Sequence, residues 1–309
     1  MLNIQTKTNN SITTSNLKDL MSDYVQYIDA SPKTIETYIK ALRNFKKWAE
    51  VNSIPQPTRQ DIITYKKVLE ETHKATTTQT YLIALKQFFR WTEQAELYPN
   101  VADNIKGVKI SKSPKKDYLN TTAVKNILSS IDQTTLKGKR DYAIIALMLT
   151  CGLRDIEVVR ANVNDLRLLG DNTVLYLQGK GRTEKAEYVI IPVETEKALR
   201  TYLKARTDNN EALFYSVSNH SSNERMATRS ISRIVKETMK NAGYGSDRLT
   251  AHSLRHTAVT LALKSGATLQ EVQQFARHTN INTTLIYAHN LERESNKCSH
   301  AIADSIFSD

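Results

Sequence analysis

Capped amphipathic stretches follow one another along the first third of the chain and limit the folds available to it. Residues 30–52 open with Ser31 and Pro32, residue types that favour the N-cap and the first position of a helix. The apolar residues behind them recur at about 3.6-residue intervals, which predicts one buried helical face. These residues are Ile35, Tyr38, Ile39, Leu42, Phe45 and Ala49.

Two further stretches repeat this pattern. Residues 58–71 begin with Thr58 as a candidate cap, and residues 76–97 carry apolar side chains at the same spacing. With a shorter helical segment at 17–29, they predict a four-helix domain over residues 17–103. Residues 1–16 are rich in Asn, Thr and Ser, and we expect them to be disordered.

The pattern changes after residue 103. Residues 104–120 are basic, contain Gly and Pro and show no sustained period, which predicts an exposed linker whose lysines either follow a phosphate backbone or are merely solvated. Helices are predicted at 121–132 and 139–161, and residues 143–149 are apolar on nearly every face and therefore buried. Short strand patterns at 162–169, 172–178 and 187–192 predict a small antiparallel sheet. The expected fold is mainly α, with a helical N-terminal domain and an α+β domain over residues 121–292.

The charge balance indicates the class of partner. Lys and Arg outnumber Asp and Glu by 43 to 32, and the net charge of +11 favours a polyanion, either nucleic acid or an anionic membrane. No apolar run reaches membrane-spanning length and the N-terminus lacks a secretory pattern, so nucleic acid is the better fit and no membrane partner is expected. Cys151 and Cys298 stand far apart, which predicts neither a disulfide framework nor a zinc cluster, and favours a reducing, cytoplasmic location.

Unusual chemistry is concentrated in the second half of the chain. An arginine follows the buried helix at a Gly-marked break, a lysine lies on a glycine-flanked turn, and a His-x-x-Arg pair shares one helical face. A histidine and, nine residues later, a tyrosine complete the set. The candidate residues are Arg154, Lys180, His252, Arg255, His278 and Tyr287.

Each candidate also has an ordinary structural interpretation. Arg154 could simply pair with Glu157, and a lysine on a turn is usually solvated. His252 and His256 have zinc-ligand spacing, but Ser253 and Leu254 stand where a zinc protease needs its glutamate, so no metal is expected. Tyr287 and His278, taken singly, would most often be packing or capping residues.

Taken in order, the motifs resemble those of the tyrosine recombinases, the phage integrase and Xer-type family. The matching segments are "CGLRDIE" for the first arginine box, "HSLRHT" for the second and "ARHTNINTTLIYAH" for the last. The resemblance extends over residues 17–309, because the N-terminal helical segment is similar to the family's core-binding domain. It implies that residues 121–292 form the catalytic domain.

The resemblance also implies a reaction. It is phosphoryl transfer between DNA strands through a covalent 3′-phosphotyrosine, with no metal or nucleotide cofactor. Planar guanidinium groups match phosphate oxygens, so the two arginines would clamp the scissile phosphate. The implied roles are phosphate binding for Arg154, Arg255 and His278, nucleophile for Tyr287, base for His252 and general acid for Lys180, with Lys185 as a second candidate acid.

The implied partners are double-stranded DNA with specific recombination sites and three further copies of the chain, forming a homotetramer on two DNA sites. Accessory DNA-bending or directionality proteins are compatible with this assembly. Residues 293–309 form an amphipathic tail that would dock on a neighbouring protomer or else fold back on its own domain. Integration and excision of a mobile element, resolution of DNA multimers and inversion all stay open.

Two other classes of function compete with this interpretation. A type IB topoisomerase shares the chemistry, although the N-terminal segment resembles recombinases. A non-catalytic DNA-binding protein built on a decayed recombinase would have lost at least one charged catalytic side chain, and none is missing from the sequence.

Overall fold

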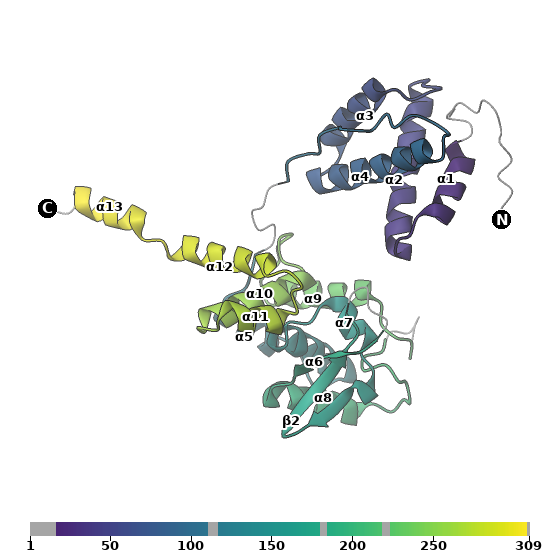
Figure 1. The fold of residues 1–309 in the computed structure, drawn as a ribbon. Coiled ribbons are helices and arrows are strands. Elements are labelled where there is room, and N and C mark those ends of the chain that lie inside the picture. The colour runs from purple at the N-terminus through teal and green to yellow at the C-terminus, as the bar shows by residue number, and fades with distance from the viewer. Residues whose placement is uncertain (1–16, 111–116, 180–183, 218–222, 308–309) are drawn as a thin grey trace. The chain divides into compact units, whose positions relative to one another are not determined.

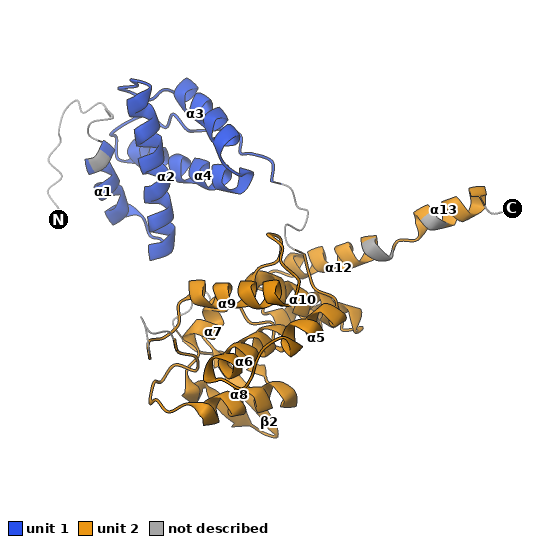
Figure 2. Cartoon of the chain, turned by 180° about the vertical axis from the view of Figure 1, so that it is seen from behind, with its two compact units in different colours: residues 1–113 blue, residues 114–309 orange. Residues whose placement is uncertain are grey.

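The computed structural model describes residues 17–110, 117–179, 184–217 and 223–307. The chain divides into two compact units, residues 1–113 and 114–309, which are coloured separately in Figure 2. The predicted fold class is confirmed: the chain is mostly helical, with one small antiparallel sheet among the described residues (Figure 1).

Unit 1 contains the helices predicted from the capped stretches. The Ser31 side chain accepts a hydrogen bond of 3.3 Å from the backbone N–H of Thr34, and Thr58 forms a reciprocal capping box with Asp61. Both predicted caps are therefore confirmed. The helices are α1 (Leu17–Tyr27), α2 (Pro32–Val51), α3 (Arg59–Thr72) and α4 (Ala75–Gln94).

Aromatic side chains fill the core of unit 1. Phe45 of α2 packs edge-on against Tyr65 of α3 and Phe89 of α4, with ring centroids 5.1 and 6.1 Å apart. Rings in this geometry contribute about 0.5–1.5 kcal/mol per pair beyond the area they bury. The Tyr65 hydroxyl donates to Asn44 Oδ1 at 2.7 Å, so its polar end is satisfied.

Both ends of the basic segment 104–120 pack into the units. Ile105 lies in the core of unit 1, and the carbonyl of Lys106 accepts a hydrogen bond from Lys66 Nζ at 2.8 Å. Leu119 lies in the core of unit 2, where its N–H donates to Thr257 Oγ1 at 2.9 Å. Ile105 and Leu119 are thus buried within a segment that the sequence pattern predicts to be exposed; residues 111–116 lie outside the described residues.

Unit 2 is built around α6 (Leu136–Thr150), which packs against α8 and α10. Residues 143–149 of α6 are all buried, as predicted, and each large apolar side chain removed from water contributes about 1.5–3 kcal/mol. The other helices are α5 (Thr121–Ser129), α7 (Asp155–Arg160), α8 (Val193–Ala205), α9 (Thr228–Asn241), α10 (Ala251–Lys264), α11 (Leu269–Ala276), α12 (Asn282–Ser295) and α13 (Cys298–Phe307).

The predicted antiparallel sheet is present. β1 (Leu166–Leu169), β2 (Asn172–Leu177) and β3 (Glu187–Ile190) lie in the order β1-β2-β3. In its register Leu175 pairs with Val189, and both side chains are buried against the unit 2 core. The predicted site residue Lys180 follows β2 in the sequence and lies outside the described residues.

Candidate active site

A tight turn after α6 places Arg154 at the start of α7. Gly152 has φ +58°, and a Cβ there would lie 3.0 Å from the Phe275 ring, so both the backbone conformation and the space favour glycine. Arg154 is the N-cap residue of α7 and stays partly exposed. The Gly-marked break in the sequence therefore leaves this side chain partly accessible to solvent.

Glu157 holds two arginines at once. Its Oε1 accepts from Arg154 Nη1 at 2.6 Å, and its Oε2 accepts from the Arg154 backbone N–H at 2.8 Å and from Arg277 Nη2 at 2.9 Å. Burial acts to raise the pKa of Glu157. The charge of Arg277, together with the hydrogen bonds and charge of Arg154, outweighs it and holds this pKa below its ordinary value. The carboxylate is therefore ionised and orients both guanidinium groups.

Arg255 lies on α10 and is almost fully buried. Its Nη1 donates to the carbonyl of Gly152 at 2.5 Å, and its Nη2 donates to the carbonyl of Ala276. Burial, followed by the charges of Arg154 and Arg277, lowers the pKa of Arg255 to about 10, so it remains a cation at neutral pH. A guanidinium has five N–H donors, and these two bonds leave others for an anion.

His278 follows α11 and makes a hydrogen bond that fixes its ring. The distance from His278 Nδ1 to Thr284 Oγ1 is 2.9 Å, and Thr284 is buried on α12. Burial, then the charges of Arg255, Arg154 and Arg277, lowers the pKa of His278 to about 4. At neutral pH the ring is uncharged and carries one N–H donor.

Tyr287 lies on α12, three residues after Thr284, and is 8% exposed. Its ring packs on Val259 and Val272, and its centroid lies 4.5 Å from that of His256 and 6.1 Å from that of His278. Burial raises the pKa of the Tyr287 phenol, while the charges of Arg255 and Arg154 act to lower it. The phenol is therefore protonated at neutral pH but is already influenced by both arginines.

The structure thus groups Arg154, Arg255, His278 and Tyr287. His252 lies exposed in the first turn of α10, close enough that its charge acts to lower the pKa of His278. Lys185, the second candidate acid, forms an ion pair with the buried carboxylate of Asp165.

Arg277 is a member of this cluster that sequence reasoning missed. It ends α11 in the left-handed conformation, with φ 53°, and its side chain is only 7% exposed. The sequence pattern of "ARHTN" does not predict a buried arginine, because the burial of Arg277 depends on the turn that brings it against Glu157. A helix-ending residue just before a predicted site histidine was the available signal.

Neither a metal cluster nor a membrane span is found in the described part of the chain. No three His, Cys, Asp or Glu side chains there are grouped as a metal ion would require, and no helix there is both long and apolar enough to cross a bilayer.

A basic stripe runs along α9 on the surface of unit 2. Arg229, Arg233, Lys236 and Lys240 are spaced four, three and four residues apart, so they share one face of the helix, and all are exposed. The opposite face buries Ile231 among other apolar residues. The stripe presents several cations toward solvent along one helix.

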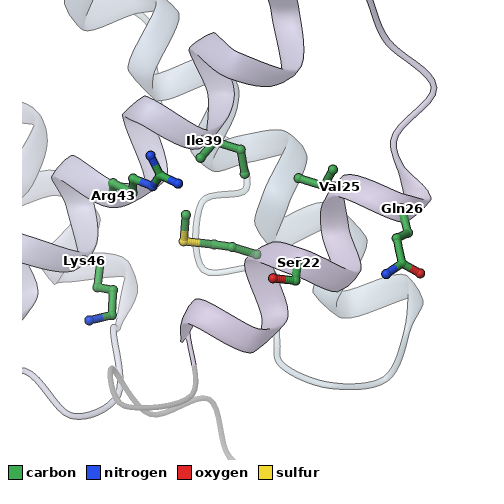
Figure 3. A pocket seen from close by; sticks show the side chains of 7 residues that line it. Ser22, Val25, Gln26, Ile39, Arg43 and Lys46 are labelled. Atoms are coloured by element: carbon green, nitrogen blue, oxygen red, sulfur yellow. The ribbon is translucent and has the colours of Figure 1, made fainter. Parts of the chain in front are cut away.

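A pocket in unit 1 lies between α1 and α2 (Figure 3). Its apolar part includes Val25 and Ile39, and Arg43 and Lys46 add cationic groups. None of the predicted site residues lines this pocket, and its lining within the described chain includes no acid and no histidine.

Comparison with known proteins assigns the family. The phage integrase family matches residues 117–294, which is more than half of the chain, and its N-terminal SAM-like domain matches residues 21–96. The chain belongs to the phage integrase family. The matched region contains every candidate residue of the cluster described above, from Arg154 to Tyr287.

Individual relatives of this integrase-family chain agree with that assignment. The tyrosine recombinase XerC of Caldanaerobacter subterraneus subsp. tengcongensis is 34% identical over 177 residues, covering 56% of this chain and 47% of the relative. The chain therefore spans about half the length of that relative.

Two solved structures share the fold. The XerH recombinase bound to palindromic difH has a TM-score of 0.73 at 22% identity, covering 93% of this chain and 85% of XerH. A lambda integrase tetramer bound to a Holliday junction has a TM-score of 0.66 at 15% identity, covering 87% and 78%.

Proposed function

We propose that this chain is a site-specific DNA recombinase that cuts and rejoins DNA strands through a covalent 3′-phosphotyrosine at Tyr287. One observation carries the proposal: the Tyr287 ring is buried beside His278, at 6.1 Å between ring centroids, and the charges of Arg255 and Arg154 act on its phenol. A cationic pocket around a phenol matches a reaction in which that phenol attacks an anionic phosphodiester. The biological outcome we propose is integration or excision of a mobile element, or resolution of DNA multimers.

The proposed phosphate site uses donors from three segments. Arg154 and Arg255 would bind the non-bridging oxygens of the scissile phosphate, and neutral His278 would donate one further hydrogen bond. If Thr284 donates its hydroxyl proton to His278 Nδ1, then Nε2 carries the ring proton and can donate to the phosphate. Donors of this kind are each worth about 3–4 kcal/mol where negative charge develops in the transition state.

The proposed chemical step forms a bond between phosphorus and Tyr287 Oη while the bond from phosphorus to the 5′ oxygen breaks. The phenolic proton passes to His252, and the departing 5′ oxygen takes a proton from Lys180. His252 suits proton exchange because it is exposed. The ion pair of Lys185 with Asp165 favours Lys180 as the acid, since a lysine engaged by a buried carboxylate is less free to approach the leaving group.

Duplex DNA is the proposed partner. The net charge of +11 and the α9 stripe supply a cationic surface, and phosphate contacts dominate the affinity of such proteins for DNA. We also propose that four copies assemble on two recombination sites. The tail supports this, because on α13 Ile302 is 58% and Phe307 82% exposed, leaving an apolar face for another protomer.

Covalent trapping tests the proposed nucleophile. A suicide duplex with a nick near the cleavage site should give a protein–DNA adduct with the wild-type chain and none with Tyr287→Phe. Tyr244→Phe is the matched control, since it removes a tyrosine hydroxyl that accepts a hydrogen bond from Asn126, away from the proposed site residues. An adduct formed by the Tyr287→Phe variant would refute the assignment of the nucleophile. Transfer of the trapped strand to a second duplex would separate a recombinase from a topoisomerase.

A further inference from the structure

Arg277 occupies a backbone conformation that its residue type disfavours. Its φ of 53° lies in the left-handed region, which glycine and asparagine adopt most readily at a helix end. It is nevertheless an arginine, and its side chain turns inward and is 7% exposed. A costly conformation combined with a buried charge indicates that the guanidinium itself has a role at this position.

The guanidinium bridges two segments of the site. It donates to the carbonyls of Phe275 at 2.9 Å, Gly152 at 3.1 Å and Cys151 at 3.4 Å, and it pairs with Glu157 at 2.9 Å. These bonds join the turn before Arg154 to the residue just before His278. The Gly152 carbonyl also accepts from Arg255, so one carbonyl positions two guanidinium groups.

The charges explain what this bridge does. Glu157 is shared between Arg154 and Arg277, and after burial the charge of Arg277 is the largest influence on the Glu157 pKa. Without Arg277, the buried carboxylate would have Arg154 as its one paired cation, and would neutralise the guanidinium that faces the phosphate. With Arg277 in place, the Arg154–Glu157–Arg277 group keeps a net positive charge.

We propose that Arg277 is a positioning residue for strand cleavage: by pairing with Glu157 it keeps Arg154 available to the phosphate and fixes the turn that carries His278. This inference rests on the proposed function, because it assumes that Arg154 and His278 bind the scissile phosphate. The hydrogen bonds of the Arg277 guanidinium go to the Glu157 carboxylate and to backbone carbonyls.

The test is single-turnover adduct formation on the nicked suicide duplex. Arg277→Gln should slow adduct formation about 10- to 100-fold, as expected when phosphate-binding groups are displaced by about an ångström, while affinity for the duplex stays within about threefold. Arg277→Lys should recover part of the rate because it restores the cation. Glu157→Gln combined with Arg277→Gln should cleave faster than Arg277→Gln alone, because the unbalanced carboxylate is gone. A purely structural role would not produce that rescue.

Two controls separate the possible failures. Arg200→Gln removes an exposed arginine that pairs with Glu196 on α8, and should cleave at the wild-type rate. If Arg277→Gln does not fold, Arg277→Gly takes its place, since glycine adopts the left-handed turn without steric cost. Wild-type rates for Arg277→Gln or Arg277→Gly, or a double variant no faster than the single one, would overturn the inference. Absence of any adduct with the wild-type chain would instead overturn the proposed function.

Discussion

At the scale of single residues, the site is a cluster of cations with too little negative charge to balance it. Arg154, Arg255 and Arg277 surround one carboxylate, Glu157, and two of these arginines are nearly buried. Burial lowers the pKa of Arg255, and repulsion from the charges of Arg154 and Arg277 lowers it further. An entering phosphate would relieve that repulsion, so the cluster is arranged to bind an anion before any chemistry begins.

Two half-buried histidines, His256 and His278, predict a loss of stability in mild acid. Burial, then neighbouring positive charge, lowers the pKa of His256 and of His278 to about 4 in the folded chain. In the unfolded chain each has its ordinary pKa near 6.5. Between these values the unfolded state binds more protons, so the free energy of unfolding falls as pH drops from about 6.5 toward 4. Because both rings are partly exposed and screened by solvent, the loss is on the order of 1 kcal/mol for each histidine.

Urea unfolding at pH 7.5 and pH 5 measures this effect. The wild-type midpoint should fall at pH 5, and His278→Asn should show a smaller fall because one depressed group is gone. His289→Asn is the matched control, since His289 is exposed and its ion pair with Glu292 lies at the surface. An equal pH dependence in His278→Asn and wild type would show that His278 does not contribute.

At the scale of elements, local signals predicted the helices of unit 1 and the three strands, but the single helix expected over residues 139–161 is wrong. The left-handed Gly152 divides that segment into α6 and α7. Ser31 and Thr58 marked their helix starts because capping depends on neighbouring residues alone. The burial of Ile105 in a segment predicted to be an exposed linker depends on a partner core that its local composition does not reveal. The left-handed Arg277 was missed for the same reason, whereas the motif order alone singled out Arg154, Arg255, His278 and Tyr287.

The α9 stripe gives an element-level prediction. Arg233→Gln with Lys240→Gln should weaken binding to duplex DNA of any sequence and make the slope of log affinity against log salt shallower by about 2, since each lost phosphate contact removes about 0.9. Lys197→Gln with Arg200→Gln is the matched control, because both of those α8 cations pair with glutamates. Mobility-shift titrations between about 50 and 200 mM salt provide the measurement. Over this range the affinity of proteins with many phosphate contacts falls by a factor of about 10³–10⁵. Equal slopes of log affinity against log salt for the two double variants would show that the α9 stripe does not contact DNA phosphates.

At the scale of the whole molecule, the last described helix, α13, leaves most of its apolar side chains exposed. Ile306 of α13 is 63% exposed, and the neighbouring apolar residues Ile302 and Phe307 are exposed as well. The buried cores of the two units do not include them. A helix of 10 residues is too short to be stable in water by itself, so it needs a surface to pack on. The sequence left open whether that surface belongs to the same chain or to a neighbour, and the exposure of α13 favours a neighbour.

Truncation of the tail decides between these two surfaces. The predicted tail comprised residues 293–309, but α12 continues to Ser295, so deletion from Lys297 onward removes α13 and leaves α12 whole. We expect the truncated chain to bind a single recombination half-site with wild-type affinity and to lose tetramers on paired sites, as measured by analytical ultracentrifugation with DNA. Ile302→Ser with Phe307→Ser should reproduce the loss without shortening the chain, and Ser305→Ala, an exposed position on the same helix, should not. Tetramers that persist after truncation, together with a lower unfolding temperature, would mean that the tail packs on its own domain.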